Sequence, residues 1–152
     1  MLERFQGREG RAALLNALRS QFLVDGSSEV ADRIASVAQL REYAPGARLF
    51  AQGERGNEVL FILAGQVSVR VGESEVSTCG AGMHVGEIAL LEPFKGRSAT
   101  VAAKDTVVVA QISAQRFTEI AGHHPELWRR VGIELARRLV RLESRLYLAA
   151  AA

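Results

Sequence analysis

The stretch EVLFILAGQVSVRVGESEVSTC, residues 58–79, decides the fold. Its glycines divide it into three short segments with strand character, at 58–63, 66–71 and 75–79. In the second segment three valines alternate with Ser68 and Arg70, so one face of that strand is apolar and the other polar. Further strands are predicted over 99–103 and 106–112. Short antiparallel strands with a turn about every eight residues are typical of a sandwich or jelly roll.

Helical periodicity flanks this β region on both sides. Apolar residues at spacings of three and four predict helices over 8–22 and 28–39, the second capped by Ser27 or Ser28. After the strands, helices are predicted over 114–122 and 125–148, the longer one begun by Pro125. We therefore expect one domain made of an N-terminal helical segment (1–39), a β-roll (40–112) and C-terminal helices (113–148).

The composition is that of an ordinary globular domain. The chain has 152 residues, 48% hydrophobic and 24% charged, with a formal net charge of +2. No apolar run approaches the roughly 18–20 residues of a membrane span, and the single cysteine, Cys79, excludes an internal disulfide. We expect a cytoplasmic protein without membrane contact. The small basic surplus of residues 113–152 predicts no nucleic-acid binding by this chain alone.

Residues 80–101, GAGMHVGEIALLEPFKGRSATV, interrupt the strand pattern and carry the chemistry. GEIALL predicts a short helical turn whose first amides, on residues 87–89, are good anion donors. Gly86 allows a ligand to approach the backbone closely. Arg97 and Ser98 follow and supply a cation and a hydroxyl, which together with the amides suit a phosphate. Glu87 cannot serve a phosphate, but its carboxylate can accept from sugar hydroxyls, so the set suits a phosphate beside a ribose.

At these residues the sequence resembles the cyclic nucleotide-binding domains. Gly86-Glu87-Ile88-Ala89-Leu90 and Arg97-Ser98-Ala99-Thr100-Val101 are similar to the two halves of that family's phosphate-binding cassette, here residues 86–101. The stretch PGARLFAQGERGNEVLFILAGQVSV and the final basic helix also resemble the family. The resemblance implies a mainly β fold with flanking helices: an antiparallel jelly-roll β-barrel with N-terminal helices, a short cassette helix and a C-terminal lid helix.

The resemblance also implies roles for individual residues. Glu87 would accept from the ribose 2′-hydroxyl, Arg97 would hold the cyclic phosphate with Ser98 and the amides after Gly86, and the lid arginines would meet the base. No metal and no cofactor are expected. The implied ligand-binding residues are Val69, Val76, Val85, Gly86, Glu87, Ile88, Ala89, Arg97, Ser98, Ala99, Arg138 and Arg141.

Departures from the family pattern concern the base. Val85 stands where relatives often have an aromatic residue, and Met83-His84 replaces their acidic and aromatic pair. Ser98 keeps the hydroxyl at a position where threonine often favours guanine. The expected ligand is therefore cyclic AMP rather than cyclic GMP, with cyclic GMP left open.

Simpler interpretations exist for several residues. Glu87 and Arg97 could form a surface pair without any ligand, but the surrounding cassette favours a site. His84, His123-His124, Cys79 and Trp128 are interpreted as packing or surface residues. On the last helix, the leucines that follow Val131 at spacings near a heptad are open to packing on the β domain or to a homodimer contact.

The leading function hypothesis is a ligand-sensing module without catalysis, whose C-terminal helix closes over the base and acts on an unknown effector. One alternative is a β-roll that no longer binds nucleotide and serves dimerisation or docking. Another is the sensor half of a transcription regulator, without a helix-turn-helix after Tyr147. A cyclic nucleotide hydrolase is disfavoured, because three scattered histidines and one cysteine do not make a metal centre.

Overall fold

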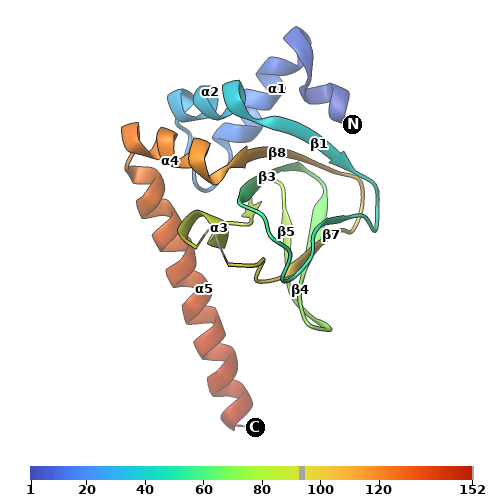
Figure 1. Ribbon diagram of the computed structural model, residues 1–152, viewed down its shortest axis with the longest axis vertical. Helices are drawn as coiled ribbons and strands as arrows, with labels where there is room; N and C mark the ends of the chain where they lie inside the picture. Colours follow the sequence, from blue (N-terminus) through green and yellow to red (C-terminus); the bar gives the residue numbers. More distant parts are fainter. Residues whose placement is uncertain (93–94, 152) are drawn as a thin grey trace.

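A computed structural model describes residues 1–92 and 95–151 (Figure 1). The N-terminal part consists of a short 3-10 helix η1 (Leu2–Phe5), helix α1 (Gly7–Arg19) and helix α2 (Ser28–Val37). Ser27 caps α2 by accepting from the amide of Val30 at 3.2 Å. The predicted second helix is therefore confirmed with the first of its two candidate caps.

In the part of the chain that the structure describes, eight strands follow, interrupted once by helix α3 (Ile88–Leu91). The strands are β1 (Gln39–Tyr43), β2 (Arg48–Phe50), β3 (Glu58–Ala64), β4 (Gln66–Val71), β5 (Ser74–Gly80), β6 (His84–Val85), β7 (Thr100–Ala103) and β8 (Val107–Ser113). Helices α4 (Ala114–His123) and α5 (Glu126–Ala151) complete the chain. In Figure 1, α1, α2 and α4 cover one side of the strands, and the far end of α5 projects beyond them.

The strands form two antiparallel four-stranded sheets, with the orders β1-β8-β3-β6 and β2-β7-β4-β5. The mainly β fold with flanking helices is thus confirmed. In the described residues the two sheets are not joined edge to edge, so the strands form two separate sheets rather than the closed barrel that was expected.

Strand β3 explains why two cores form. It is buried on both faces: Val59, Phe61 and Leu63 belong to the core shared with the helices, whereas Leu60 and Ile62 belong to the core shared with the second sheet. A strand buried on both faces is apolar almost throughout, which is the pattern of residues 58–64.

The residues interpreted as packing residues lie in or against these cores. Cys79 is buried in the core between the sheets, and burial raises the pKa of its thiol. Trp128 packs edge to face on Phe117, with 5.2 Å between ring centroids. Among the described residues, no helix has an apolar stretch long enough to cross a membrane.

Candidate functional site

A cavity of about 350 Å³ opens between the second sheet, the cassette turn and α5. That volume lies in the range of small-molecule pockets, roughly 300–1,000 Å³. All twelve residues predicted to bind a ligand border it: they come from β4, β5, β6, the turn at 86–89, the segment 97–99 and α5. Their roles toward a ligand stay predictions. Pro93 and Phe94, in the middle of the cassette, lie outside the described residues.

Arg97 is the buried cation of the cavity, with 8% of its surface exposed. Its Nη1 donates to the carbonyl of Glu58 at 2.9 Å, and its Nη2 lies 3.1 Å from Oε2 of the same residue. The guanidinium also stacks on Phe50, 4.2 Å from the ring centroid. Burial lowers the pKa of Arg97, and the nearby carboxylates of Glu58, Glu54 and Glu87 partly offset this lowering. The arginine nevertheless remains charged.

One donor of this arginine has no partner among the described residues. Nε of Arg97 is buried and makes no hydrogen bond within the described part of the chain. A buried donor without a partner is costly unless something else accepts from it. The guanidinium of Arg97, which borders the cavity, therefore has a donor that the described residues leave unsatisfied.

Glycines make room for the guanidinium. Gly86 has a φ of +89°, and a Cβ there would lie 2.7 Å from the carbonyl oxygen of Glu58 and 2.9 Å from Nη1 of Arg97. A Cβ on Gly56 would lie 2.8 Å from Nη2 of Arg97. Gly86 is thus required by its backbone conformation and by the nearby Glu58 carbonyl, whereas a Cβ on Gly56 would displace the guanidinium of Arg97.

Glu87 is the buried anion of the cavity, with 3% exposed. Its Oε1 forms an ion pair with Nη1 of Arg138 on α5, and its Oε2 lies 4.0 Å from Nε2 of His84. Because each carboxylate oxygen can accept more than one hydrogen bond, these contacts leave room for a hydroxyl donor.

The amides of the turn are used in part. The amide of Ala89 donates to the carbonyl of Gly86 at 3.1 Å, inside the turn. The expectation of free amides on residues 87–89 is therefore wrong for Ala89. The reason is that a helix as short as α3 forms its first backbone hydrogen bond at this residue.

Helix α5 forms one wall of the cavity with Glu134, Arg138, Arg141, Leu142 and Arg145. Nη1 of Arg145 donates across the cavity edge to the carbonyl of Val76 at 3.3 Å. Arg137, Arg141 and Arg145 follow one another at intervals of four residues, which is the spacing of a solvent-exposed helix face. Of these three arginines, Arg141 and Arg145 border the cavity.

Two contacts at the site were not anticipated from the sequence. Glu58 was interpreted only as the start of a strand, yet it partners Arg97. His84 is 1% exposed, and its Nε2 lies 2.7 Å from Oε2 of Glu134. No spacing signal links these residues, because the partners lie on different elements.

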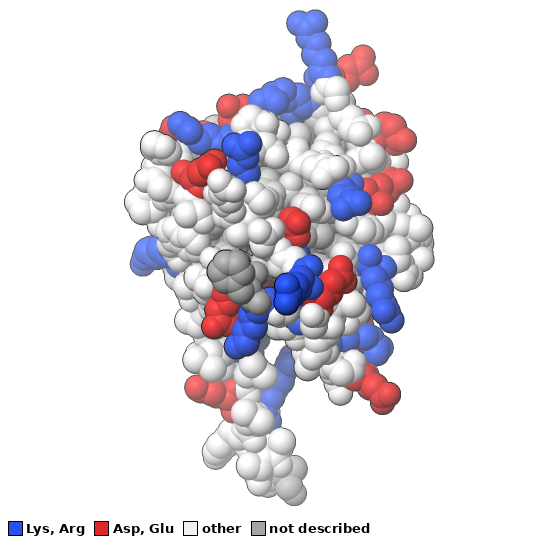
Figure 2. All heavy atoms as spheres, viewed as in Figure 1, with Lys and Arg blue, Asp and Glu red and all other residues white. Residues whose placement is uncertain are grey.

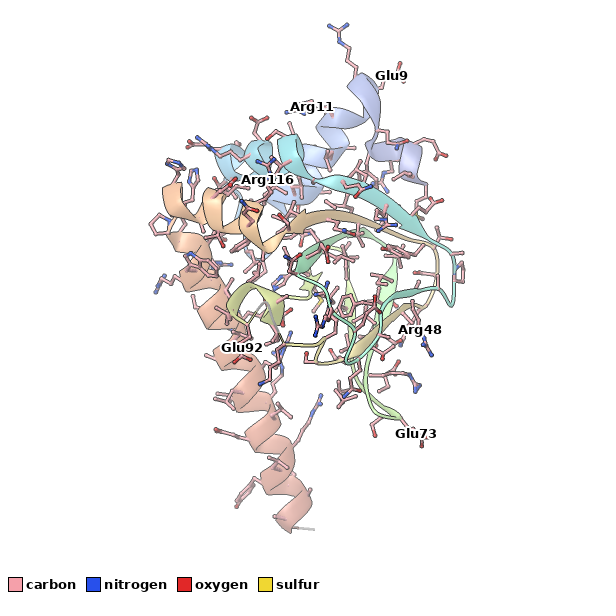
Figure 3. The ribbon with its side chains drawn as sticks, in the orientation of Figure 1. Glu9, Arg11, Arg48, Glu73, Glu92 and Arg116 are labelled. Atoms are coloured by element: carbon pink, nitrogen blue, oxygen red, sulfur yellow. The ribbon has the colours of Figure 1, made fainter. Side chains whose placement is uncertain are left out.

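Two labelled side chains help to place the site in space. Figure 3 labels Glu92, at the end of α3, and Arg116, on α4. Arg116 is exposed and does not border the cavity. Within the described residues, no cluster of three or more histidine, cysteine, aspartate or glutamate side chains could hold a metal ion.

The model of the family described as "Cyclic nucleotide-binding domain" matches residues 40–124. This chain belongs to that family. It is 42% identical over 139 residues to the Pycsar effector protein PaPycTIR of Pseudomonas aeruginosa, covering 91% of this chain and 45% of that protein. It is 31% identical over 109 residues to the cAMP-activated global transcriptional regulator CRP of Escherichia coli O6:H1, covering 68% of this chain and 52% of the regulator. This cyclic nucleotide-binding domain thus spans about half the length of these relatives.

Solved structures share the fold of this cyclic nucleotide-binding domain. The catabolite activator protein of Thermus thermophilus superimposes with a TM-score of 0.76 and 25% identity, over 86% of this chain and 63% of that one. A PKAR CBD2 domain with bound Sp-2Cl-cAMPS gives a TM-score of 0.72 at 22% identity, over 88% of this chain and 91% of that one. The family identified from the cassette residues is confirmed.

Proposed function

We propose that this domain senses a 3′,5′-cyclic nucleotide in the cavity beside the cassette and reports binding through the position of α5. The observation that carries the proposal is that one cavity is bordered by a buried guanidinium, Arg97, and a buried carboxylate, Glu87. A cyclic nucleotide offers an anion for the first and a sugar hydroxyl donor for the second. The unpartnered Nε of Arg97 supports an anionic ligand.

The proposed movement of α5 on ligand binding is based on the ion pair between Glu87 and Arg138. Its carboxylate contacts both the cavity and Arg138 of α5, so a hydroxyl that binds Glu87 changes the environment of the helix contact. A ligand can shift the helix only if it binds the two helix positions unequally. By this proposal the chain acts by binding rather than by catalysis.

The proposal also includes a preference for one base of the cyclic nucleotide. Cyclic AMP is expected to bind more tightly than cyclic GMP, as the sequence resemblance implies, and a relative at 31% identity is named as cAMP-activated. Phosphate and ribose contacts are the same for every base, so pyrimidine cyclic nucleotides belong in the same comparison.

The exposed leucines of α5 favour a second role, which we propose as homodimerisation. Leu139, Leu142 and Leu146 are 57%, 50% and 68% exposed, at spacings close to a heptad seam. In Figure 2 the end of the molecule formed by the last turns of α5 carries few charged side chains. A second copy of the same helix would cover this apolar stripe.

Titration calorimetry tests the proposed sensing function. The chain is titrated with cyclic AMP, GMP, CMP and UMP, and with linear 5′-AMP as the control. We expect at least one cyclic nucleotide to bind at micromolar concentration or tighter, with the linear nucleotide much weaker. Absence of heat with all of them, in a preparation checked for bound nucleotide, contradicts the proposal and favours the β-roll as a docking or dimerisation domain.

A further inference from the structure

A buried histidine stands next to the cavity and contacts two of the acids that line it. His84, on β6, is 1% exposed and pairs in register with Phe61 of β3. Its Nδ1 is buried and makes no hydrogen bond within residues 1–92 and 95–151. The ring nitrogens of a buried histidine that only packs in a core normally form hydrogen bonds. The unsatisfied nitrogen of His84 therefore needs an explanation.

Those surroundings come from α5. Nε2 of His84 lies 2.7 Å from Oε2 of Glu134, without the alignment of a linear hydrogen bond, so the attraction is mainly between charges. Oε1 of Glu134 lies 3.7 Å from Nη2 of Arg138, which in turn pairs with Glu87. We call these four residues, His84, Glu87, Glu134 and Arg138, the His84 cluster.

The His84 cluster lies where α5 leaves the core: beyond Val131, Leu135 is only partly buried against the core, and Arg145 donates to the carbonyl of Val76. The buried residues of α5 are Leu127 and Val131, both in its first turns, and no described residue after Val131 is buried. Glu134 and Arg138 lie one and two turns further on, where the helix passes the cassette. Polar contacts therefore take over from apolar packing at this point.

The charge of the cluster depends on the histidine. Two carboxylates and one arginine leave a net charge of −1 when His84 is neutral, and zero when it is protonated. Burial alone would raise the pKa of Glu134, but contacts with His84, Arg138 and Arg141 hold it below its ordinary value. These contacts therefore favour the charged form of Glu134, and a buried charge that loses its partner is strongly destabilising.

Other charged or titratable groups also face the cluster. Arg141 of α5 acts on Glu134, Arg97 of the cassette interacts with Glu87, and the buried thiol of Cys79 on β5 faces both acids. The thiol is neutral at physiological pH because burial raises its pKa, and both arginines stay charged. His84 is the histidine of this neighbourhood, and histidine is the side-chain type whose ordinary pKa lies between pH 5 and 8.

We propose that His84 is a positioning residue for nucleotide binding: in its protonated form it holds Glu134, and with it α5, over the cavity. The inference rests on the proposed sensing function and deepens it. An incoming cyclic phosphate adds a negative charge to the cavity, which favours the protonated histidine further. Binding and protonation of His84 therefore support each other, so affinity falls as pH rises through the range in which histidines titrate.

The first test needs no variant. The binding heat of the tightest cyclic nucleotide among AMP, GMP, CMP and UMP is measured at pH 7 in two buffers with different ionisation enthalpies. We expect net proton uptake on binding, and an affinity that falls about fivefold or more between pH 5.5 and 8.5. Zero uptake together with a flat pH profile overturns the role of His84 while leaving the sensing function intact. Absence of binding at every pH overturns the sensing function itself.

The second test assigns the effect to the residue. His84→Phe keeps an aromatic ring beside Phe61 and removes the charge, and His84→Gln is the fallback if that variant does not fold. The control is His123→Gln, an exposed histidine of α4 outside the cavity. We expect both His84 variants to bind more weakly at pH 5.5 with a flat pH profile, whereas the control keeps the wild-type profile.

A double-mutant cycle completes the test. Glu134→Gln in the His84→Phe background removes the uncompensated charge, so it should restore part of the affinity that His84→Phe loses. Strictly additive losses, or a wild-type pH profile in the His84 variants, overturn the inference.

Discussion

The guanidinium of Arg138 on α5 pairs with the carboxylate of Glu87, the residue immediately before α3. The predicted ribose acceptor and the predicted lid helix are thus in direct contact. Any ligand that engages Glu87 acts on the same carboxylate that anchors α5. This relationship links the chemistry of the cavity to the position of the helix.

Removing Arg138 should therefore affect both binding and the helix. Arg138→Ala leaves the buried carboxylate of Glu87 without its arginine, and we expect nucleotide affinity to fall about tenfold. Hydrogen exchange of amides after Val131 should quicken, because the attachment of α5 is lost. Arg129→Ala, an exposed arginine of the same helix outside the cavity, is the control. Unchanged affinity and exchange in Arg138→Ala would refute the link.

Gly86 should be intolerant of substitution for two separable reasons. Gly86→Ala forces a Cβ to 2.7 Å from the Glu58 carbonyl and 2.9 Å from Arg97, at a φ of +89°. The matched control is Gly72→Ala, which has a φ of +60° and open space around its Cβ. We expect urea unfolding to show a loss of about 1 kcal/mol for the control and clearly more for Gly86→Ala. Only Gly86→Ala should weaken nucleotide binding, and equal effects of both substitutions would contradict this account of the site.

The cassette residues of the candidate site could be predicted from the sequence because they lie close together in the chain. Gly86, Glu87 and Arg97 lie within one short segment, and their spacing indicates phosphate and sugar contacts. The partners of these residues could not be predicted in the same way. Glu58 and Glu134 lie on β3 and α5, and only the fold brings them to the cassette.

The leucine stripe of the last helix also shows that residue spacing alone does not identify the partner of a helix face. Its spacing could not distinguish packing on the β domain from a contact with a second copy. In the structure the stripe divides: Val131 is buried, whereas Leu139 and Leu146 are exposed. The mainly β class with flanking helices was predictable from periodicity, but the separation of the two sheets was not, because strand pairing at the edges leaves no mark in the spacing.

The proposed dimer is tested by sedimentation. Leu139→Lys combined with Leu146→Lys places charges on the exposed stripe and should convert a dimer to a monomer, since a buried lysine pair in a helical seam is unfavourable. Val140→Lys, at a 60% exposed position off the stripe, is the control and should remain dimeric. A monomeric wild-type chain at tens of micromolar, or a dimeric double variant, would contradict the proposed contact.

Glu134 should make stability depend on pH in a defined direction. Its pKa in the folded protein lies below the ordinary value of 4.5, because His84, Arg138 and Arg141 outweigh the effect of burial. A lowered carboxylate pKa contributes stability above 4.5, and that contribution is lost as pH falls through the folded value. Glu134→Gln should therefore lower the free energy of unfolding at pH 7 and have less effect near pH 3.5.

Urea unfolding at the two pH values measures this difference. Glu143→Gln, at an exposed acid of the same helix, serves as the control. An effect of Glu134→Gln that is equal at both pH values would show that the carboxylate is not held by its partners.

The most direct test of the central claim is calorimetry of Arg97→Ala beside Arg116→Ala with the cyclic nucleotide that the wild type binds most tightly. Arg116 is an exposed arginine of α4, so its removal changes the net charge equally without touching the cavity. Charge-assisted hydrogen bonds contribute about 1.5–3 kcal/mol each, so we predict at least about a tenfold loss of affinity for Arg97→Ala, with a cooperative unfolding transition retained. The control should bind like the wild type. Equal affinities of the two variants would show that this cavity does not bind the cyclic phosphate through Arg97.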